Sequence, residues 1–173
     1  MTRCSRARAV LHMSSAGVYE YQGHEPRRES DPLGDNHHAM FPTYSISKIA
    51  AETVCRFVAR QHGIPTTIAR LSVPYGDNGG WMYYHMLMMQ QGIAIDIHPD
   101  RPNVYNPIHV DDYIEKIPYL LGAATPEVTT TNFGGSQPAS IEEWCDYIGE
   151  LTGFVPVFNE TTRAFGSLRI DTT

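Results

Sequence analysis

The stretch TYSISKIAAETVCRFVARQHGIPTTIARLSV, residues 43–73, decides the fold. Its first part, residues 43–62, carries apolar side chains at nearly helical spacing: Ile46, Ile49, Ala50, Val54, Phe57 and Val58. This spacing predicts an amphipathic helix, and Gly63 is a typical residue just past a helix end. Residues 64–73 are rich in β-branched and apolar side chains, so they predict a buried strand that ends at Pro74.

The sequence before the helix predicts a second strand and a long loop. Residues 9–15, AVLHMSS, are short and largely apolar and end in small polar residues, as a buried strand does. Strand, helix and strand in this order form the βαβ unit of a parallel sheet. Residues 23–42 are rich in Pro, Gly, Asp, Glu and His without periodicity and predict a loop, which at this length is usually functional. We therefore expect an α/β fold.

Further elements are expected after residue 76. A Met- and Tyr-rich helix is predicted over 81–91, a short strand over 93–97, and a helix over 111–121 in which Pro118 would introduce a kink. Ser140 and Glu143 form an S-x-x-E capping box, which predicts a helix that ends at Gly153. No repeat or interdomain linker interrupts these elements.

Composition bounds the function classes. The chain has 173 residues, 42% of them hydrophobic, which suits one domain with a core of its own. The formal net charge is −6 and the basic residues are scattered, so nucleic acid is not an expected partner. No apolar run reaches the roughly 18 residues of a membrane helix, and the N-terminus does not resemble a signal peptide. We expect a soluble protein that does not enter a membrane.

The cysteines and histidines do not predict a metal site. Cys4, Cys55 and Cys145 are widely separated and form no C-x-x-C pair, so neither a disulfide framework nor a zinc site is expected, and a reducing, cytoplasmic location fits. His37 and His38 are adjacent rather than four residues apart, and we interpret them as loop or surface residues.

Tyr44 and Lys48 raise the first question of chemistry. Residues four apart share one face of a helix, so the Tyr44 hydroxyl and the Lys48 ammonium can lie close together. A fixed positive charge favours the phenolate form of a tyrosine and makes it a usable acid or base. Ser14 and Ser15 end the preceding strand, where open α/β sheets gather their ligands. A Y-x-x-x-K pair alone is a weak signal, because so short a motif recurs by accident.

Five stretches in order make the signal specific. They are SSAGVY (14–19), YSISK (44–48), RLSVPYG (70–76), IHVDDY (108–113) and NFGGSQPASIEEW (132–144). Together they resemble the extended short-chain dehydrogenases/reductases, the NAD-dependent epimerase/dehydratase family. The resemblance implies the C-terminal part of a Rossmann-like, doubly wound parallel sheet over residues 1–76, and mainly a small α/β substrate-binding part over 77–173.

The resemblance also implies the site. Ser15, Tyr44 and Lys48 would form the catalytic set: Tyr44 as general acid/base, Lys48 favouring its phenolate and holding the nicotinamide ribose, and Ser15 orienting the substrate oxygen. The cofactor would be NAD or NADP. Cofactor contacts are expected at Tyr44, Lys48, Ser14, Leu71 and Pro74, and substrate contacts at Ser15, Val73, Tyr105 and Trp81. The helix that carries Tyr44 and Lys48 often packs against its copy in this family, which implies a possible homodimer.

The chain departs from the family pattern at the cofactor side. The family opens with a glycine-rich turn that cradles the cofactor pyrophosphate at a helix N-terminus. Here GDNGG (76–80) and FGG (133–135) lack the G-x-x-G-x-x-G spacing, and the chain begins at the strand that carries Ser15. We therefore expect that several βα units are missing, that the C-terminus is also trimmed, and that cofactor binding is weak or lost.

The substrate side departs as well. The resemblance implies that nucleotide-sugar members carry an arginine at the position of Tyr105, and that this arginine binds the diphosphate. They often carry asparagine at the position of Val73. Arg101 could substitute from a nearby loop, although an exposed, solvated arginine is the commoner meaning. Ala16 and Gly17 follow the serine where the dehydratases typically have Asp and Glu, which disfavours dehydration.

Two functions remain open from the sequence. The first is an NAD(P)-dependent oxidoreductase or epimerase that exchanges hydride at a secondary alcohol or ketone, with a nucleotide-sugar epimerase as the alternative substrate class. The second is a non-catalytic, truncated remnant that acts at most as a binding or assembly module. Tight cofactor binding would favour the first and count against the second.

Overall fold

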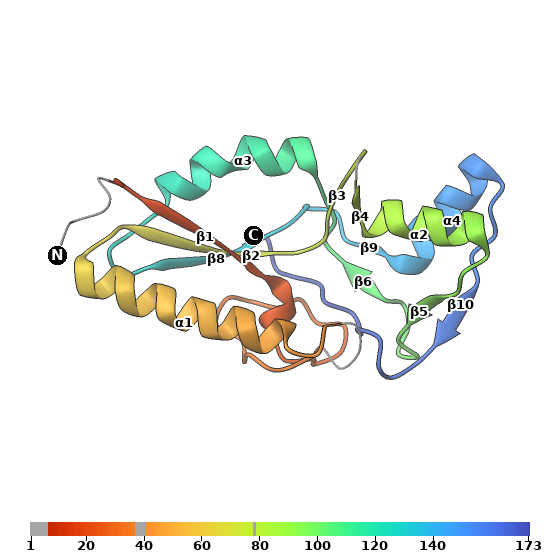
Figure 1. The fold of residues 1–173 in the computed structure, drawn as a ribbon, viewed down its shortest axis with the longest axis horizontal. Helices are drawn as coiled ribbons and strands as arrows, with labels where there is room; N and C mark the ends of the chain where they lie inside the picture. The colour runs from red at the N-terminus through yellow and green to blue at the C-terminus, as the bar shows by residue number, and fades with distance from the viewer. Residues whose placement is uncertain (1–6, 37–40, 78) are drawn as a thin grey trace.

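A parallel three-stranded sheet forms the centre of the N-terminal part. The computed structural model describes residues 7–36, 41–77 and 79–173 (Figure 1). Strands β1 (Val10–Ser15), β2 (Thr66–Leu71) and β8 (Thr129–Phe133) lie in the order β1-β2-β8 and are all parallel. Helix α1 (Tyr44–His62) covers one face of this sheet and α3 (Val110–Gly122) covers the other (Figure 1). The predicted α/β fold with a βαβ unit is confirmed.

The sequence explains why these elements form. Helix α1 ends at Gly63, whose φ of 61° is left-handed and whose N–H reaches back to the last turn of the helix. Strand β2 is central, so residues Thr66 to Arg70 are buried, and its Ile68 packs with Ala59 of α1. Strand β1 is an edge strand whose only sheet neighbour among the described residues is β2.

The C-terminal part is a smaller layer of short strands and two helices. Helices α2 (Trp81–Gln91) and α4 (Ile141–Thr152) pack beside the strand pair β5 (Ile95–Ile97) and β10 (Phe158–Glu160) (Figure 1). The remaining short strands are β3 (Pro74–Gly76), β4 (Gly79–Gly80), β6 (Val104–Tyr105), β7 (Ile108–His109) and β9 (Ala139–Ser140). The apolar core of this layer comprises Met89, Ile95, Ile97, Tyr105, Ile141, Trp144 and Cys145.

The capping box predicted for α4 is present. Ser140 Oγ accepts the Glu143 N–H at 3.1 Å, and a Glu143 carboxylate oxygen accepts the Ser140 N–H at 2.7 Å. The helix ends at Gly153 as expected, with a left-handed φ of 76°. Helix α3 continues through Pro118.

Several predicted boundaries differ from the structure. The strand expected over 93–97 begins at Ile95, and the strand expected over 64–73 ends at Leu71. Strand β8 was not predicted. The loop over 23–42 holds isolated bridges, including one between Arg27 and Ile170. Cys4, His37 and His38, which were interpreted from the sequence, lie outside the described residues.

No helix in the described ranges is long and apolar enough to cross a bilayer.

Candidate active site

Ser15 lies at the carboxyl end of β1, where the chain turns into the short helix η1 (Ala16–Val18). Its backbone is extended, and its hydroxyl oxygen accepts the Gly17 N–H at 3.0 Å. This bond uses one lone pair of the hydroxyl, and the hydroxyl proton is not part of it. Ser15 is therefore fixed as the N-cap of η1 while its O–H is available to donate to a bound oxygen.

Tyr44 and Lys48 occupy the first turns of α1, and both are half-buried. The Lys48 ammonium lies 5.7 Å from the centre of the Tyr44 ring, and it donates to the Met13 carbonyl of β1 at 3.3 Å. Helical spacing thus brings the two side chains together, as the sequence predicted, and the bond to Met13 directs the ammonium to the end of β1.

Ser45 links α1 to the turn of Ser15. Its side chain is fully buried, and its hydroxyl donates to the Gly17 carbonyl at 2.6 Å. Gly17 therefore receives Ser45 on its carbonyl and gives its N–H to Ser15. The start of α1 and the end of β1 are connected through one residue, which places Ser15, Tyr44 and Lys48 in one region.

The buried carboxylate of Glu52 bonds helix α1 to strand β1. Glu52, one turn after Lys48, accepts the Ser14 hydroxyl at 2.6 Å and two donors of Arg70 at 3.0 and 2.9 Å. Burial opposes the charged form, but the hydrogen bonds from Arg70 and Ser14 outweigh it and lower the pKa of Glu52. Arg56 adds a second cation 3.6 Å from this carboxylate. Sequence reasoning missed Glu52, although residues 44, 48 and 52 share one helix face.

Further contacts connect Arg70 through Tyr19 to Asn132 of β8. The Arg70 guanidinium lies 4.8 Å from the centre of the Tyr19 ring. The Tyr19 hydroxyl donates to Asn132 of β8 at 2.6 Å, and burial raises the pKa of Tyr19 to about 12. The Asn132 amide donates to the carbonyls of Arg27 and Asp171 at 2.8 and 2.9 Å. Three strands and the C-terminal segment are thereby joined to the helix that carries Tyr44.

The other residues predicted to contact cofactor lie nearby in different settings. Ser14 is buried with its hydroxyl donated to Glu52, so its side chain faces α1. Leu71 is half-buried at the end of β2, paired with Ser15 in the sheet register, and Pro74 is exposed. Their cofactor contacts stay predictions.

The residues predicted to contact substrate are mainly core residues. Val73 is buried in the apolar cluster of the C-terminal layer. Tyr105 is 2% exposed, its hydroxyl donates to the Gly166 carbonyl at 2.9 Å, and burial raises its pKa. Trp81 packs edge-on against Tyr105 with ring centres 5.0 Å apart. Their substrate contacts also stay predictions.

Arg101, the cation considered as a substitute for an arginine at position 105, is engaged by two carboxylates. Its guanidinium lies 2.9 Å from Glu142 and 3.5 Å from Glu160, and 44% of its side chain is exposed. It is therefore a surface arginine whose charge is already balanced by α4 and β10.

The glycine-rich stretches do not form a pyrophosphate cradle among the described residues. A Cβ at Gly80 would lie 2.4 Å from the Pro74 carbonyl, and one at Gly135 would lie 2.0 Å from the Pro107 carbonyl. Each glycine thus allows close backbone packing, leaving no room there for a ligand. These two stretches therefore offer no glycine-lined site for a pyrophosphate, and the cofactor contacts of Ser15, Tyr44 and Lys48 stay predictions. No three His, Cys, Asp or Glu side chains in these ranges are grouped to hold a metal ion.

A parallel sheet with a helix on each face is the arrangement of a Rossmann-like fold. A sequence profile of the NAD dependent epimerase/dehydratase family matches residues 1–133, so the chain belongs to this family. The predicted family and fold class are confirmed, and NAD is the cofactor for which the family is named. No curated protein sequence matches the chain.

Solved structures show the same fold. UDP-glucose 4-epimerase from Thermotoga maritima, solved with UDP-glucose, is 20% identical with a TM-score of 0.73, and the match covers 97% of this chain and 56% of that one. UDP-glucose 4-epimerase from Thermus thermophilus, solved with NAD, is 18% identical at 0.71, covering 96% and 55%. dTDP-glucose 4,6-dehydratase from Bacillus anthracis, solved with NAD, is 22% identical at 0.72, covering 94% and 52%. The chain spans about half the length of these proteins.

Proposed function

We propose that the chain carries the proton-transfer half of an NAD-dependent oxidoreductase or epimerase active site, acting at a secondary alcohol or ketone. The observation that supports this most directly is the set of bonds that holds α1 against the end of β1. Lys48 donates to Met13 at 3.3 Å and Ser45 donates to Gly17 at 2.6 Å. These bonds bring Tyr44 and Lys48 to the turn that Ser15 caps.

Each of the three side chains has one task. Tyr44 removes the proton from a substrate hydroxyl or returns it to the oxygen, because the neighbouring ammonium of Lys48 stabilises the phenolate. Ser15 has its hydroxyl proton available and donates it to the same substrate oxygen, where negative charge develops. Lys48 also offers N–H donors to the ribose of the cofactor. Bound NAD or NADP supplies the acceptor and donor of the hydride.

The proposed substrate class depends on whether positions 105 and 101 offer a free cation to a diphosphate. Tyr105 is buried between two tryptophans, and the guanidinium of Arg101 is paired with two carboxylates. A diphosphate would therefore lack a free cationic clamp at these two positions. We propose an uncharged alcohol or ketone. A nucleotide sugar remains the alternative, since structural neighbours include a UDP-glucose complex and a UDP-glucuronic acid complex with NAD. Ala16 and Gly17 follow Ser15, which disfavours a dehydratase.

A binding or assembly module is the second candidate function. It is favoured by one edge of β1, with which no strand of the described residues pairs, because an unpaired strand edge can accept a strand of another chain. It is also favoured by exposed apolar residues on α1, which we propose as the contact of a homodimer.

Cys55 and Cys145 are free thiols, in keeping with a reducing, cytoplasmic location.

Calorimetric titration of NAD⁺ and NADH into the purified chain tests the proposal. Micromolar binding that Lys48→Met weakens would support the enzyme and would justify a screen of alcohols and ketones. Tyr44→Phe is the companion variant, because it retains the ring and removes the group that moves the proton. No heat from a folded sample, with or without substrate, would reject cofactor-dependent catalysis by this chain and favour the module.

A further inference from the structure

A cleft of about 340 Å³ lies where the loop of residues 20–36 meets the segment that contains Asp171, and none of its lining residues belongs to the candidate active site. This volume is at the lower end of the range of small-molecule sites, about 300 to 1,000 Å³. The polar side chains that line the cleft are those of Gln22, Glu25, Arg27, Arg28, Asp31 and Asp171. The cleft therefore presents charged groups to a ligand.

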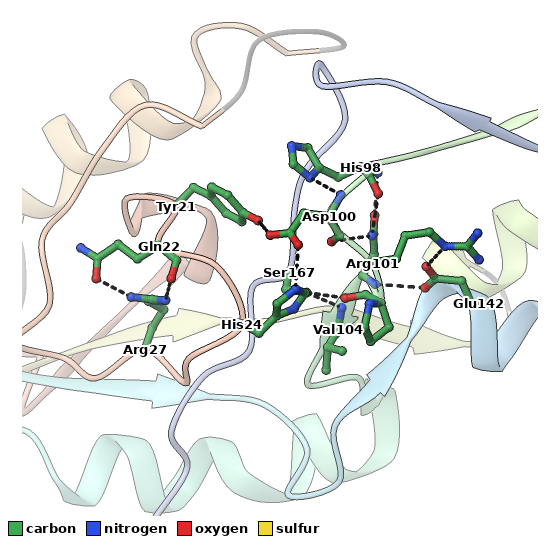
Figure 2. Close-up of polar contacts among 12 residues, drawn as sticks. Tyr21, Gln22, His24, Arg27, His98, Asp100, Arg101, Val104, Glu142 and Ser167 are labelled. Carbon is green, nitrogen blue, oxygen red and sulfur yellow. Dashed lines mark hydrogen bonds and ion pairs between the residues drawn. The ribbon is translucent and has the colours of Figure 1, made fainter.

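Arg27 is a buried cation without a counter-ion. It is only 3% exposed, and its guanidinium donates from Nη1 to the side-chain oxygen of Gln22 at 2.6 Å and from Nη2 to the Gln22 carbonyl at 2.9 Å (Figure 2). Both acceptors are neutral, and no carboxylate of the described residues lies within ion-pair distance of Arg27. A charge buried this deeply normally has a partner of opposite charge.

The guanidinium of Arg27 also keeps a free donor. A guanidinium has five N–H donors, and Gln22 accepts two of those of Arg27. The Nε–H has no partner among the described residues, and it is not sealed inside the protein, because His12 Nε2 and Thr67 Oγ1 are the fully buried side-chain polar atoms without a partner in these ranges. The small accessible part of Arg27 therefore includes a free N–H donor at the cleft that this residue lines.

The backbone holds Arg27 in place on both sides. Its N–H donates to the Arg169 carbonyl at 2.8 Å. Its own carbonyl accepts the Asp171 N–H at 2.8 Å and the side-chain amide of Asn132, from β8, also at 2.8 Å. Because these bonds exist without a ligand, the cation is already positioned, and a ligand would lose little free energy in ordering it.

The other charged groups of the cleft are divided between paired and unpaired ones. Arg28 Nε lies 3.4 Å from the Asp171 carboxylate, and hydrogen bonds from Thr173 further hold the pKa of Asp171 below its usual range. Asp31 accepts only the backbone N–H of Arg28 at 2.9 Å, and Glu25 is exposed with no partner among the described residues. Asp31 and Glu25 are therefore carboxylates that no described cation neutralises.

We propose that this cleft binds a small zwitterion of the amino-acid type, with one carboxylate and one ammonium. The ligand carboxylate accepts the Nε–H of Arg27 and supplies the counter-ion that the buried guanidinium lacks. The ligand ammonium faces Glu25 and Asp31. A simple anion would be attracted by Arg27 but repelled by these two carboxylates, and a simple cation would leave Arg27 without a counter-ion. The charges of the cleft therefore favour a ligand that carries both signs.

A ¹H–¹⁵N NMR titration of the full chain at low ionic strength tests the site without an assay of catalysis. Glycine, β-alanine and 4-aminobutyrate are the probes, because their two charges are separated by increasing distances. Acetate and methylammonium each carry one of the two charges. We expect at least one zwitterion to shift the Arg27 Nε–H signal and the amide signals of residues 22–31, with a Kd about tenfold lower than that of either single-charge probe. No shift with any zwitterion, or an equal Kd for acetate or methylammonium, would overturn the proposal.

Variants assign the two ligand charges to their partners. Glu25→Gln should weaken zwitterion binding about threefold without weakening that of acetate, because it removes an exposed partner of the ammonium. Glu20→Gln is the matched control, since Glu20 is exposed in the same loop but does not line the cleft, and it should leave the Kd unchanged. Arg27→Lys keeps the charge but loses the Nε–H and should weaken zwitterion binding at least about tenfold. Equal Kd values in Glu25→Gln and Glu20→Gln would contradict the proposal, and these two exposed variants decide the question even where Arg27→Lys does not fold.

Discussion

Ser14 Oγ lies 2.6 Å from a carboxylate oxygen of Glu52, so the residue before Ser15 is bonded to the helix that carries Tyr44 and Lys48. The same carboxylate holds both the Nε and an Nη donor of Arg70 from the neighbouring strand. Helix α1, β1 and β2 therefore meet at one buried charge. The geometry of the candidate active site depends on an ion pair that takes no direct part in the proposed chemistry.

Glu52→Gln should destabilise the chain by about 3 kcal/mol, because it leaves the buried guanidinium of Arg70 without its carboxylate. Ser14→Ala should cost about 1.5 kcal/mol, since it removes one donor to the same charge. The free energy of unfolding in urea measures both. Glu150→Gln, at an exposed position of α4, is the control and should stay within about 0.5 kcal/mol of the unmodified chain. Equal effects at Glu52 and Glu150 would contradict this role of the ion pair.

The regular elements were predictable because their signals are local. The helix predicted over 43–62 is observed as Tyr44–His62, and the capping box at Ser140 begins a helix observed as Ile141–Thr152. Strand β8, TTTNF, was missed because a threonine run shows no alternation of apolar residues. It is a strand because each of its residues pairs with one of β2, which is a tertiary contact.

The site was predictable only in part for the same reason. Tyr44 and Lys48 are four residues apart, so they lie on one face of the helix, and this spacing can be read from the sequence. Glu52 continues the face, but its partner Arg70 lies 18 residues further on, and only the folded sheet brings the two together. Tyr105 was expected at the substrate from the resemblance, and the structure shows it 2% exposed in an aromatic cluster.

Acid should weaken the core of the C-terminal layer through His85. Its Nδ1 accepts the Trp144 indole N–H at 2.9 Å, and burial lowers the pKa of His85 to about 4 from 6.5. The unfolded chain therefore binds the proton more tightly than the folded chain, so stability is complete above pH 6.5 and decreases as the pH falls toward 4. The loss is on the order of 2 to 3 kcal/mol, at about 1.4 kcal/mol for each pKa unit.

Urea unfolding between about pH 7 and pH 5 measures the larger part of this loss, about 2 kcal/mol, because carboxylates with ordinary pKa values remain mostly ionised there. His85→Gln, whose amide oxygen can accept the indole N–H, should remove most of the slope. His12 contributes in the same direction, since burial and then Lys48 lower its pKa, so a small slope should remain. A full slope in His85→Gln would show that other groups govern the acid response.

Helix α1 should mediate a homodimer. Ile46, Val54, Phe57 and Val58 are 53%, 61%, 65% and 41% exposed, and their spacing places them along one side of the helix. Phe57→Asp should convert the dimer to a monomer in sedimentation equilibrium, because a carboxylate would be buried without a partner. Tyr119→Asp, at a residue 74% exposed on α3, is the matched control and should leave the dimer intact. A monomeric unmodified chain at high concentration would end this proposal.

Gly166→Ala should displace the loop that carries Tyr21. A Cβ at Gly166 would lie 2.3 Å from the Tyr21 ring, closer than two carbon atoms can approach, so the ring or the C-terminal segment has to move. Overpacking of this kind costs about 1 to 3 kcal/mol. The change should raise the amide hydrogen-exchange rates of residues 21–27 at every pH, because moving the ring also breaks the hydrogen bond from the Tyr21 hydroxyl to Asp100. Gly122→Ala is the control, since a Cβ there meets nothing within 4 Å and the residue ends a helix, and its exchange should match the unmodified chain. Unchanged exchange in Gly166→Ala would mean that the ring adjusts within its pocket and that this contact does not hold the loop.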